Sequence, residues 1–515
     1  MAGSIAIVAT LTRAASLEAL GQIPAAVTIL EVPERQDHSF SATELRRHYS
    51  GKLLYSLPQN STDQFPIPVA ARQRALIQAA RDYDLVRLNA DCDLSPEVLA
   101  AIPVTQRLIS WRGESLGLAH LYSAFAQISS VPARYYSLIT HGKRAHDGIA
   151  PLLLLKELRR TDVIAFCEGK AGFWSRILSP HFGAPLVFAR LGHGPAGDSC
   201  EPSVHELLDD YGLSVLRPVH ELYGIVGNRV FESLSPHLHN AGYRALDYPA
   251  VFLPFYVDCF EDFWREIIAP SAIAALGLSI KGLTIVSPHK EVAFTTASVR
   301  SPMASRAAAS NIFLHRNGFW EAHTTDTESV VGIGCNGKKF AKPVKAAVIG
   351  CGGAGRAIAA ALQQAGAQVT LVNRGKERAK LAVSLLGLPF IPLPEFRADG
   401  FSLVVNATPV GRDEDTLPFE IDSLASRALV VDLVYRAGPT PLVAGVVARG
   451  GTVIDGYDVL LNQVRKQFQL MTGYKMPSEI GRHTITARAF GSHLGARNSW
   501  QPHSMDFSSV CKDDA

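Results

Sequence analysis

The stretch Lys345–Arg378, KAAVIGCGGAGRAIAAALQQAGAQVTLVNRGKER, decides the fold of the C-terminal half of the chain. It contains an apolar run (346–349), a glycine turn, a helix-forming run (356–365) and a second apolar run (368–372). A strand, a G-x-G-x-x-G turn, a helix and a strand form the unit that holds a dinucleotide pyrophosphate at a helix N-terminus. We therefore predict a dinucleotide site, with a purely structural glycine turn as the alternative. Its turn residues are Gly350, Gly352, Gly353, Ala354 and Gly355.

The end of the second strand indicates which dinucleotide is bound. An NAD site usually carries Asp or Glu there, which accepts a hydrogen bond from the ribose 2′-hydroxyl. Here Asn373 and Arg374 stand at the strand end, with Lys376 and Arg378 close behind. Cations can hold a 2′-phosphate that a carboxylate would repel, so the sequence predicts NADP. A solvated surface charge cluster is the alternative.

The length and composition limit the class of protein. A chain of 515 residues predicts about two to four domains. A hydrophobic content of 47%, 19% charged residues and a net charge of +3 are typical of a soluble globular protein and indicate neither nucleic acid nor membrane as a partner. The seven cysteines are scattered and lack a C-x-x-C, so we expect neither disulfides nor a metal site. The absence of a membrane-spanning run and of a basic start to MAGSIAIVATLTR favours a cytoplasmic location.

The first part of the chain, residues 1–217, alternates short apolar runs with amphipathic segments. Eight strand–helix units in about 215 residues predict a (β/α)₈ barrel, with an open α/β sheet as the alternative. The expected strands are Ile5–Ala9, Val27–Glu31, Leu53–Ser56, Leu85–Leu88, Arg107–Ser110, Tyr135–Ile139, Val163–Phe166 and Leu186–Phe188, and the clearest helices are Val69–Arg81, Ser115–Ser129 and Ile149–Arg160.

The remaining chain predicts three further parts. Residues 222–327 read as a small α/β domain with strands at Tyr223–Val226, Val251–Tyr256 and Leu283–Val286. Residues 328–456 form the dinucleotide-binding domain, with later strands at Leu403–Val405 and Ala428–Leu433. A helix over 457–473 carries one apolar stripe and is expected to pack back on the small domain. From Ile480 the sequence is polar and aperiodic, so we expect a disordered tail over 480–515.

Three segments of the small domain hold more polar residues than a core needs. Ser233 and Ser235 precede a helix and suit a polyol or carboxylate ligand, although Ser235 could simply cap that helix. Lys290 follows a strand and a proline, and Asp326 lies at the boundary with the next domain. A lone Lys or Asp is more often a surface charge than a functional group.

The motifs of this region, read in order, resemble those of the shikimate dehydrogenase family across residues 222–475. They are SLSPHLHN, PHKE, SN before a strand, TTD, GCGGAGRA, NRGKERA, NATPVG and DGYDVLLNQ. The resemblance implies a Rossmann domain and the NADPH-dependent reduction of 3-dehydroshikimate to shikimate, a step in aromatic amino acid biosynthesis.

The resemblance also implies roles for individual residues. Lys290 and Asp326 would be the catalytic pair, in which the lysine stabilises charge on the substrate oxygen and relays a proton. Ser233 and Ser235 would hold the substrate carboxylate. The hydroxyls of the substrate would contact Asn311 and Gln463, with Tyr435 as a further contact. The residues expected to contact the cofactor are those of the glycine turn, Asn373, Arg374, Arg378, the 406–411 loop with Thr408, and Gly456.

The sequence departs from the family pattern at four positions. Val286 and Thr284 replace the threonine and asparagine usual four and six residues before the lysine, although Ser287 could supply a displaced hydroxyl. Thr324 replaces an asparagine, and Gly375 replaces a threonine that often helps to bind the 2′-phosphate. The choice between shikimate and a relative such as quinate is therefore left open.

The N-terminal barrel resembles type I 3-dehydroquinate dehydratase, and the whole chain resembles the fused dehydratase–shikimate dehydrogenase. The dehydratase family forms a Schiff base with a lysine on the sixth strand and uses a histidine on the fifth. Ser137 stands at the lysine position and Arg112 at the histidine position, while Asn89 replaces a glutamate on the fourth strand. We therefore expect a barrel that has lost dehydratase activity.

Some residues of the dehydratase pattern remain. Glu31 and Arg176 are kept, but they bind and orient a substrate and supply no amine. Lys143 and Lys170 lie in loops and are the alternative nucleophiles.

There are three rival hypotheses for the whole chain: a fully bifunctional enzyme, a quinate-type dehydrogenase and a non-catalytic ligand sensor. The presence of both Lys290 and Asp326 argues against the sensor. We expect a monomer or a homodimer.

Overall fold

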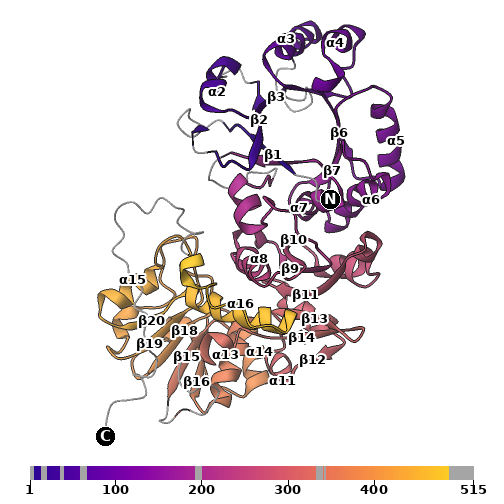
Figure 1. Ribbon diagram of the computed structural model, residues 1–515. Helices are drawn as coiled ribbons and strands as arrows, with labels where there is room; N and C mark the ends of the chain where they lie inside the picture. The colour runs from indigo at the N-terminus through magenta and orange to yellow at the C-terminus, as the bar shows by residue number, and fades with distance from the viewer. Residues whose placement is uncertain are drawn as a thin grey trace. The chain divides into compact units, whose positions relative to one another are not determined.

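The computed structural model describes residues 5–12, 20–21, 23–34, 40–57, 67–191, 200–331, 340 and 344–485 (Figure 1). By its internal contacts the chain divides into two compact units. The first unit comprises Met1–Leu222, Arg229–Phe231 and Asp247–Ile280, and the second comprises Tyr223–Asn228, Glu232–Leu246 and Lys281–Ala515. No helix in the described ranges has both the length and the apolar character that a bilayer crossing requires.

The first unit holds a parallel eight-stranded barrel, as the alternation of strands and helices predicts. Strand β1 pairs in parallel with β2 on one side and with β8 on the other, so the ladder returns from the last strand to the first. Apolar side chains from these strands, including Val8, Leu54 and Phe166, form a buried core. The strands are β1 Ala6–Thr10, β2 Val27–Pro33, β3 Lys52–Ser56, β4 Leu85–Asn89, β5 Arg107–Glu114, β6 Tyr135–His141, β7 Val163–Glu168 and β8 Leu186–Arg190.

Amphipathic helices follow the barrel strands. Helix α4 begins after Ser95, whose hydroxyl accepts the Val98 N–H, and helix α2 begins with a capping box between Ser41 and Glu44. The segment Asp247–Ile280 groups with this unit, where Phe255 packs on Trp174 with ring centroids 5.7 Å apart. The helices are α2 Ala42–His48, α3 Val69–Asp82, α4 Pro96–Ala101, α5 Leu118–Ser129, α6 Ile149–Leu158, α7 Phe173–Leu178 and α9 Phe260–Phe263.

A second sheet has the strand order β10-β9-β11-β13-β14-β12. Strands β13 and β14 form an antiparallel hairpin in which Asn317 and Gly318 have φ of 51° and 79°. Asn-Gly is the preferred pair for the left-handed turn that such a two-residue connection needs. The elements are β9 Glu221–Gly227, α8 Ser235–Ala245, β10 Ala250–Tyr256, β11 Ser279–Ile285, α10 Lys290–Thr296, β12 Val299–Arg300, α11 Pro302–Ala307, β13 Ile312–Arg316, β14 Phe319–His323 and α12 Glu328–Val331.

The third sheet is the parallel sheet of a Rossmann-type domain, with the order β17-β16-β15-β18-β19-β20. The order reverses between β15 and β18, and ligands of such sheets bind at this switch point, outside the carboxyl ends of the strands. The elements are β15 Lys345–Ile349, α13 Gly353–Gln364, β16 Gln368–Asn373, α14 Lys376–Leu386, β17 Phe390–Pro392, β18 Leu403–Asn406, β19 Leu429–Asp432, α15 Pro441–Ala448 and β20 Thr452–Ile454.

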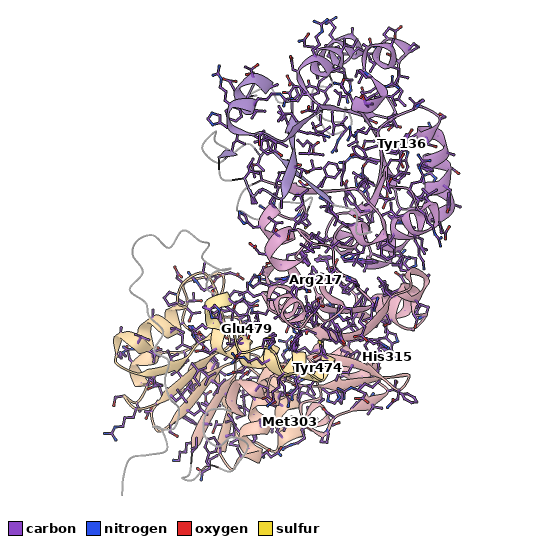
Figure 2. The ribbon with its side chains drawn as sticks, viewed as in Figure 1. Tyr136, Arg217, Met303, His315, Tyr474 and Glu479 are labelled. Atoms are coloured by element: carbon purple, nitrogen blue, oxygen red, sulfur yellow. The ribbon has the colours of Figure 1, made fainter. Side chains whose placement is uncertain are left out.

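Helix α16, Gly456–Thr472, returns from the Rossmann-type sheet to the second sheet within the second unit (yellow in Figure 1). Its last turn accepts hydrogen bonds from the Tyr223 hydroxyl at Met471 O (3.1 Å) and from Arg316 Nη2 at Leu470 O (2.6 Å). Figure 2 labels Tyr474 just beyond this helix. The return of the helix agrees with the apolar stripe that the sequence shows.

The start of the predicted disordered tail is placed too early in the chain. Residues Ile480 and Ile485 are buried, and Arg482 forms ion pairs with Asp455 and Asp458 at the start of α16. These contacts hold residues 480–485, because an apolar pair and a half-buried guanidinium anchor them. The rest of the predicted tail, 486–515, lies outside the described residues.

Candidate active site

The glycine turn joins β15 to α13 and forms a cradle for phosphate. Gly350 has φ of +105°, a left-handed conformation that favours glycine. A Cβ on Gly355 would lie 1.8 Å from the Gly350 carbonyl, whereas a Cβ on Gly352 would meet nothing within 4 Å. Helix α13 begins at Gly353, earlier than predicted, and no side chain caps its first turn. The turn therefore leaves backbone N–H groups and open space at a helix N-terminus, which fits a pyrophosphate.

The residues predicted to select NADP follow β16. Asn373 supports the turn itself, since its Oδ1 accepts the Cys351 N–H (3.2 Å) and its Nδ2 donates to Gly375 O (2.7 Å). Arg374 and Arg378 are exposed, and no ion pair within the described ranges occupies either guanidinium. Two uncommitted cations beside the glycine turn suit a 2′-phosphate.

Lys290 and Asp326 form a close ion pair. Lys290 Nζ lies 2.8 Å from Asp326 Oδ2 and 3.1 Å from Oδ1, and the side chains are 15% and 4% exposed. Lys290 is the first residue of α10, and its carbonyl accepts the Ser310 N–H (2.9 Å). The two residues, distant in sequence, are therefore brought into direct contact at a largely buried position with a restricted opening to solvent.

The predicted hydroxyl-binding residues meet at the same carboxylate. Asn311 Nδ2 donates to Asp326 Oδ1 (3.1 Å), and Gln463 Nε2, from α16, lies 3.3 Å from the same oxygen. Asn311 also accepts the Thr325 N–H at its Oδ1 (2.7 Å). The carboxylate thus has three neighbouring donors, and the amides are placed where substrate hydroxyls could replace some of these contacts.

Ser233, Ser235 and Tyr435 form a second polar group. The Ser233 hydroxyl accepts the Ser235 N–H (3.2 Å), and the Tyr435 hydroxyl is hydrogen-bonded to Ser233. Helix α8 begins at Ser235 itself, so the Ser235 side chain does not cap it. Burial raises the pKa of Tyr435, which keeps its phenol protonated and able to donate to a carboxylate.

The predicted loop 406–411 is held by its own Asn406 and by Asp432, a residue that sequence reasoning missed. Asn406 is fully buried; its Oδ1 accepts from Thr408 Oγ1 (2.7 Å), and its Nδ2 donates to Asp432 Oδ1 (2.9 Å). Asp432 also accepts from Thr440 Oγ1 (2.6 Å), and burial raises the pKa of this carboxyl. In the sequence, this network is indicated only by an Asn and an Asp at the ends of two apolar strands.

Gly456, predicted to contact the cofactor, is the first residue of α16. A Cβ on Gly456 would lie 2.2 Å from Val434 O, so glycine permits the close approach of α16 here.

A second missed network lies behind Asn311. Gln467 of α16 accepts from Thr284 Oγ1 (3.1 Å) and donates to Thr325 Oγ1 (3.1 Å). His239 is buried beside Gln467, and its burial lowers the pKa of the imidazole to about 3. The network fixes β11, α8 and α16 around the Lys290–Asp326 pair. Among the described residues no group of three or more His, Cys, Asp or Glu is arranged to hold a metal.

The barrel of the first unit contains a cavity of about 160 Å³. Arg87 Nη2 lies 3.1 Å from Glu31 Oε1, and Arg176 Nη1 lies 3.1 Å from Glu201 Oε1. Arg112 Nη1 lies 2.5 Å from Glu168 Oε2. The cavity is lined by Thr10, Glu31, Arg87, Arg112, Ile139, Phe166, Arg176, Phe188 and Glu201.

The barrel residues singled out by sequence are only partly at this cavity. Arg112, Glu31 and Arg176 line the cavity, but Ser137 and Asn89 do not. The residue of β6 that lines it is Ile139 instead of Ser137, and the residue of β4 is Arg87 instead of Asn89. Asn89 instead orders a turn, since its Oδ1 accepts the Asp91 N–H (3.1 Å). Sequence reasoning missed Arg87, a charged residue inside an apolar strand.

The loop lysines lie away from the cavity lining. Lys170 Nζ lies 5.7 Å from the centroid of the Tyr256 ring, and the Lys143 N–H donates to Asp147 (2.9 Å). Within the described part of the barrel, no lysine lines the cavity.

Comparisons with known proteins divide the chain in the same way as the folds. Residues 225–313 match the shikimate dehydrogenase substrate-binding domain, and residues 27–215 match type I 3-dehydroquinase. Residues 346–388 match ketopantoate reductase PanE/ApbA, over the glycine turn and the strands beside it. Each family match falls on one part of the chain.

A shikimate dehydrogenase (NADP(+)) of Halobacterium salinarum is 34% identical over 273 residues, which are 52% of this chain and 99% of the relative. The chain belongs to the shikimate dehydrogenase family. The chloroplastic bifunctional 3-dehydroquinate dehydratase/shikimate dehydrogenase of Arabidopsis thaliana is 28% identical over 353 residues, which are 64% of this chain. The chain spans 57% of the length of that plant protein. The solved shikimate dehydrogenase of Aquifex aeolicus is 30% identical, with a TM-score of 0.46 over 52% of this chain and 97% of that one.

Proposed function

We propose that the chain is an NADP-dependent shikimate dehydrogenase that interconverts 3-dehydroshikimate and shikimate. The observation that carries this proposal is the buried pair of Lys290 and Asp326, joined at 2.8 Å and surrounded by Asn311 and Gln463. The family membership of the second unit supports the same reaction. A sensor would need the glycine turn but not a lysine–aspartate pair beside it.

The residues present account for the proton side of the reaction. When bound, NADPH supplies the hydride that reduces the ketone carbon. The Lys290 ammonium stabilises the negative charge that develops on the ketone oxygen and donates a proton to it, so a hydroxyl forms. Asp326 holds the ammonium in position through two short contacts. Ser233, Ser235 and Tyr435 supply hydroxyl groups for the substrate carboxylate.

NADP as the cofactor is supported by three observations. The strand end carries Asn373 in place of a carboxylate, Arg374 and Arg378 are exposed and uncommitted, and the Halobacterium relative is named for NADP(+). A cytoplasmic location and a monomeric or dimeric state remain predictions from the sequence.

The direct test follows the absorbance of the reduced cofactor with four combinations, NADP⁺ or NAD⁺ with shikimate or quinate. We expect reduction of NADP⁺ by shikimate to have the highest kcat/KM. Faster turnover of quinate would support the quinate-type alternative, which the departure from the family pattern at Val286 leaves open. No reduction in any combination, with NADPH still bound, would favour the sensor.

For the barrel, the family match of residues 27–215 favours the bifunctional alternative over an inactive domain. The side chains favour the opposite conclusion, because a Schiff base needs an amine and the described cavity lining has guanidinium groups instead. We propose that the barrel retains the dehydratase fold without Schiff-base chemistry.

The test of this second proposal uses the Lys290→Ala protein, in which the dehydrogenase lysine cannot be trapped by mistake. The protein is incubated with 3-dehydroquinate, the enone absorbance is followed, and borohydride is then added before peptide mass spectrometry. We expect neither absorbance nor an adduct. An adduct on Lys143 or Lys170 would establish the bifunctional alternative, and turnover without an adduct would indicate dehydration by another mechanism.

A further inference from the structure

Arg356 lies at the centre of the contacts between the glycine turn and the segment that carries Lys290. It is on α13, four residues after the N-cap, and its side chain is fully buried. Its Nε donates to Ala307 O (2.7 Å), and its Nη1 donates to Cys351 O in the glycine turn (3.1 Å). Its Nη2 donates to Glu291 Oε1 (2.8 Å). One guanidinium thus joins three separate segments of the second unit.

The Arg356–Glu291 pair is not an obvious source of stability. A buried charge has a desolvation cost that its partner often fails to offset. Here Arg356 is fully buried, whereas the Glu291 side chain is 51% exposed, so solvent screens the carboxylate. A buried apolar side chain at position 356 would avoid the desolvation cost. The position of Arg356 is therefore better explained by the segments that its hydrogen bonds hold together.

That geometry concerns the catalytic lysine directly. Glu291 is the neighbour of Lys290 in the first turn of α10, and the Lys290 carbonyl is held from the other side by Ser310 N–H. A Cβ on Gly353 would lie 3.4 Å from Lys290 Cβ and 2.8 Å from Ala309 Cβ, so the glycine turn packs against the lysine stem. The phosphate-binding turn and the lysine are therefore in contact through both packing and the Arg356 hydrogen bonds.

We propose that Arg356 and Glu291 are positioning residues that align the Lys290 ammonium with the cofactor bound at the glycine turn. The inference rests on the proposed function for its kinetic consequence. Neither residue needs to touch the substrate: Arg356 fixes the Cys351 carbonyl and the Glu291 side chain at the same time. A small rotation of α10 would move Lys290 relative to the nicotinamide, and misplacement by about 1 Å can lower a rate by about a hundredfold.

The test compares Glu291→Gln with a matched control, Arg306→Met. Arg306 Nη2 donates to Gln363 Oε1 (2.6 Å), so it also joins α11 to α13, but it does not contact the Lys290 segment. Glu291 is half-exposed, so Glu291→Gln should fold and keep a weaker hydrogen bond in which the Arg356 guanidinium donates to a neutral amide oxygen. We expect kcat for shikimate oxidation to fall about tenfold, with the NADPH Kd unchanged and a primary deuterium isotope effect that increases. The Arg306→Met variant should keep kcat and the isotope effect.

A second readout is independent of turnover. The rate at which an acylating reagent modifies Lys290 is measured by mass spectrometry, with and without NADPH, in the wild type and both variants. Glu291→Gln should change this rate and weaken the response to NADPH, while Arg306→Met should change neither. A wild type without dehydrogenase activity, but with this lysine response, would contradict the proposed function and keep the positioning role. An active Glu291→Gln protein with unchanged kcat and unchanged lysine reactivity would overturn the positioning role.

Discussion

The Lys290 site and the barrel cavity both contain partly buried ion pairs, but they differ in the cation. In the second unit a primary amine faces Asp326, whereas in the barrel Arg87, Arg112 and Arg176 each face a glutamate. An ammonium can give up a proton or become a nucleophile, but a guanidinium stays protonated and acts through hydrogen bonds. The proposed proton transfer at Lys290 and the proposed absence of Schiff-base chemistry in the barrel both depend on this difference between the two cations.

The most damaging change to the dehydrogenase site should be the loss of its amine. Lys290→Ala should lower kcat by at least about a thousandfold, because the amides of Asn311 and Gln463 carry no positive charge with which to stabilise the developing oxyanion. The NADPH Kd, measured by titration of cofactor fluorescence, should change little. Lys345→Ala, at an exposed position on β15, is the control.

Lys290→Arg tests the difference between the two regions at one residue. It places a guanidinium beside Asp326, as guanidinium groups lie beside glutamates in the barrel. We expect a loss almost as large as that of Lys290→Ala, because arginine keeps the charge but cannot relay the proton. If Lys290→Arg retained near wild-type kcat, charge alone would be sufficient, and the argument against chemistry in the barrel would weaken.

Asp326→Asn should have a smaller effect. The amide keeps a hydrogen-bonding group beside Lys290, Asn311 and Gln463 but removes the negative charge. We expect kcat for shikimate oxidation to fall about tenfold to a hundredfold, because the ammonium loses its charged partner. A variant with the wild-type kcat would show that the charge of the carboxylate is not needed to hold the ammonium in position.

Cofactor choice should respond to a single exposed arginine. Arg374→Ala should raise the KM for NADP⁺ about tenfold and leave the KM for NAD⁺ nearly unchanged, because only NADP carries the 2′-phosphate. Lys380→Ala is the matched control, since Lys380 lies on α14 and is paired with Glu377 (3.2 Å). An equal loss with both cofactors would mean that Arg374 contacts a group common to both.

Local sequence patterns predicted the strands well but not their polar ends. The apolar part of β5 was placed at Arg107–Ser110, whereas the strand runs to Glu114 and carries Arg112 into the cavity. The ladder with β6 continues through polar residues because each buried backbone group needs a partner. A strand prediction from apolar periodicity uses only the apolar residues, so it does not include the polar ends of strands such as β5.

The pairing of Lys290 with Asp326 could be expected from the sequence because each residue lies in a recognisable motif, PHKE or TTD. The residues that support it could not be expected in this way. Gln467 meets Thr284, and Arg356 meets Glu291, across long stretches of sequence. Such pairings depend on how helices pack on the sheets, which no local spacing encodes. Arg87 was missed for a different reason, because the fourth strand was aligned on Asn89.

The smallest predicted effect concerns His239, which is buried beside Gln467 in the second unit. No histidine is among the described residues that line the barrel cavity. The His239 ring is buried against Tyr243 and Phe468, and burial lowers its pKa from an ordinary value of 6.5 to about 3. Below pH 6.5 the unfolded chain therefore takes up a proton at this residue that the folded chain does not. The free energy of unfolding should fall as the pH decreases from 6.5 to about 3, by up to about 1.4 kcal/mol per pH unit from this group.

In His239→Asn this contribution should disappear. The urea midpoints of the variant and the wild type, measured at pH 7.5 and pH 5.5, separate the two effects of the substitution. At pH 7.5 the imidazole is neutral in both states, so any difference there reports lost packing. The additional loss on acidification should be smaller in the variant, by about 1 kcal/mol. If both proteins lost the same free energy of unfolding between pH 7.5 and pH 5.5, His239 would be protonated in the folded state. The surroundings of His239 would then be more accessible to water than its burial indicates.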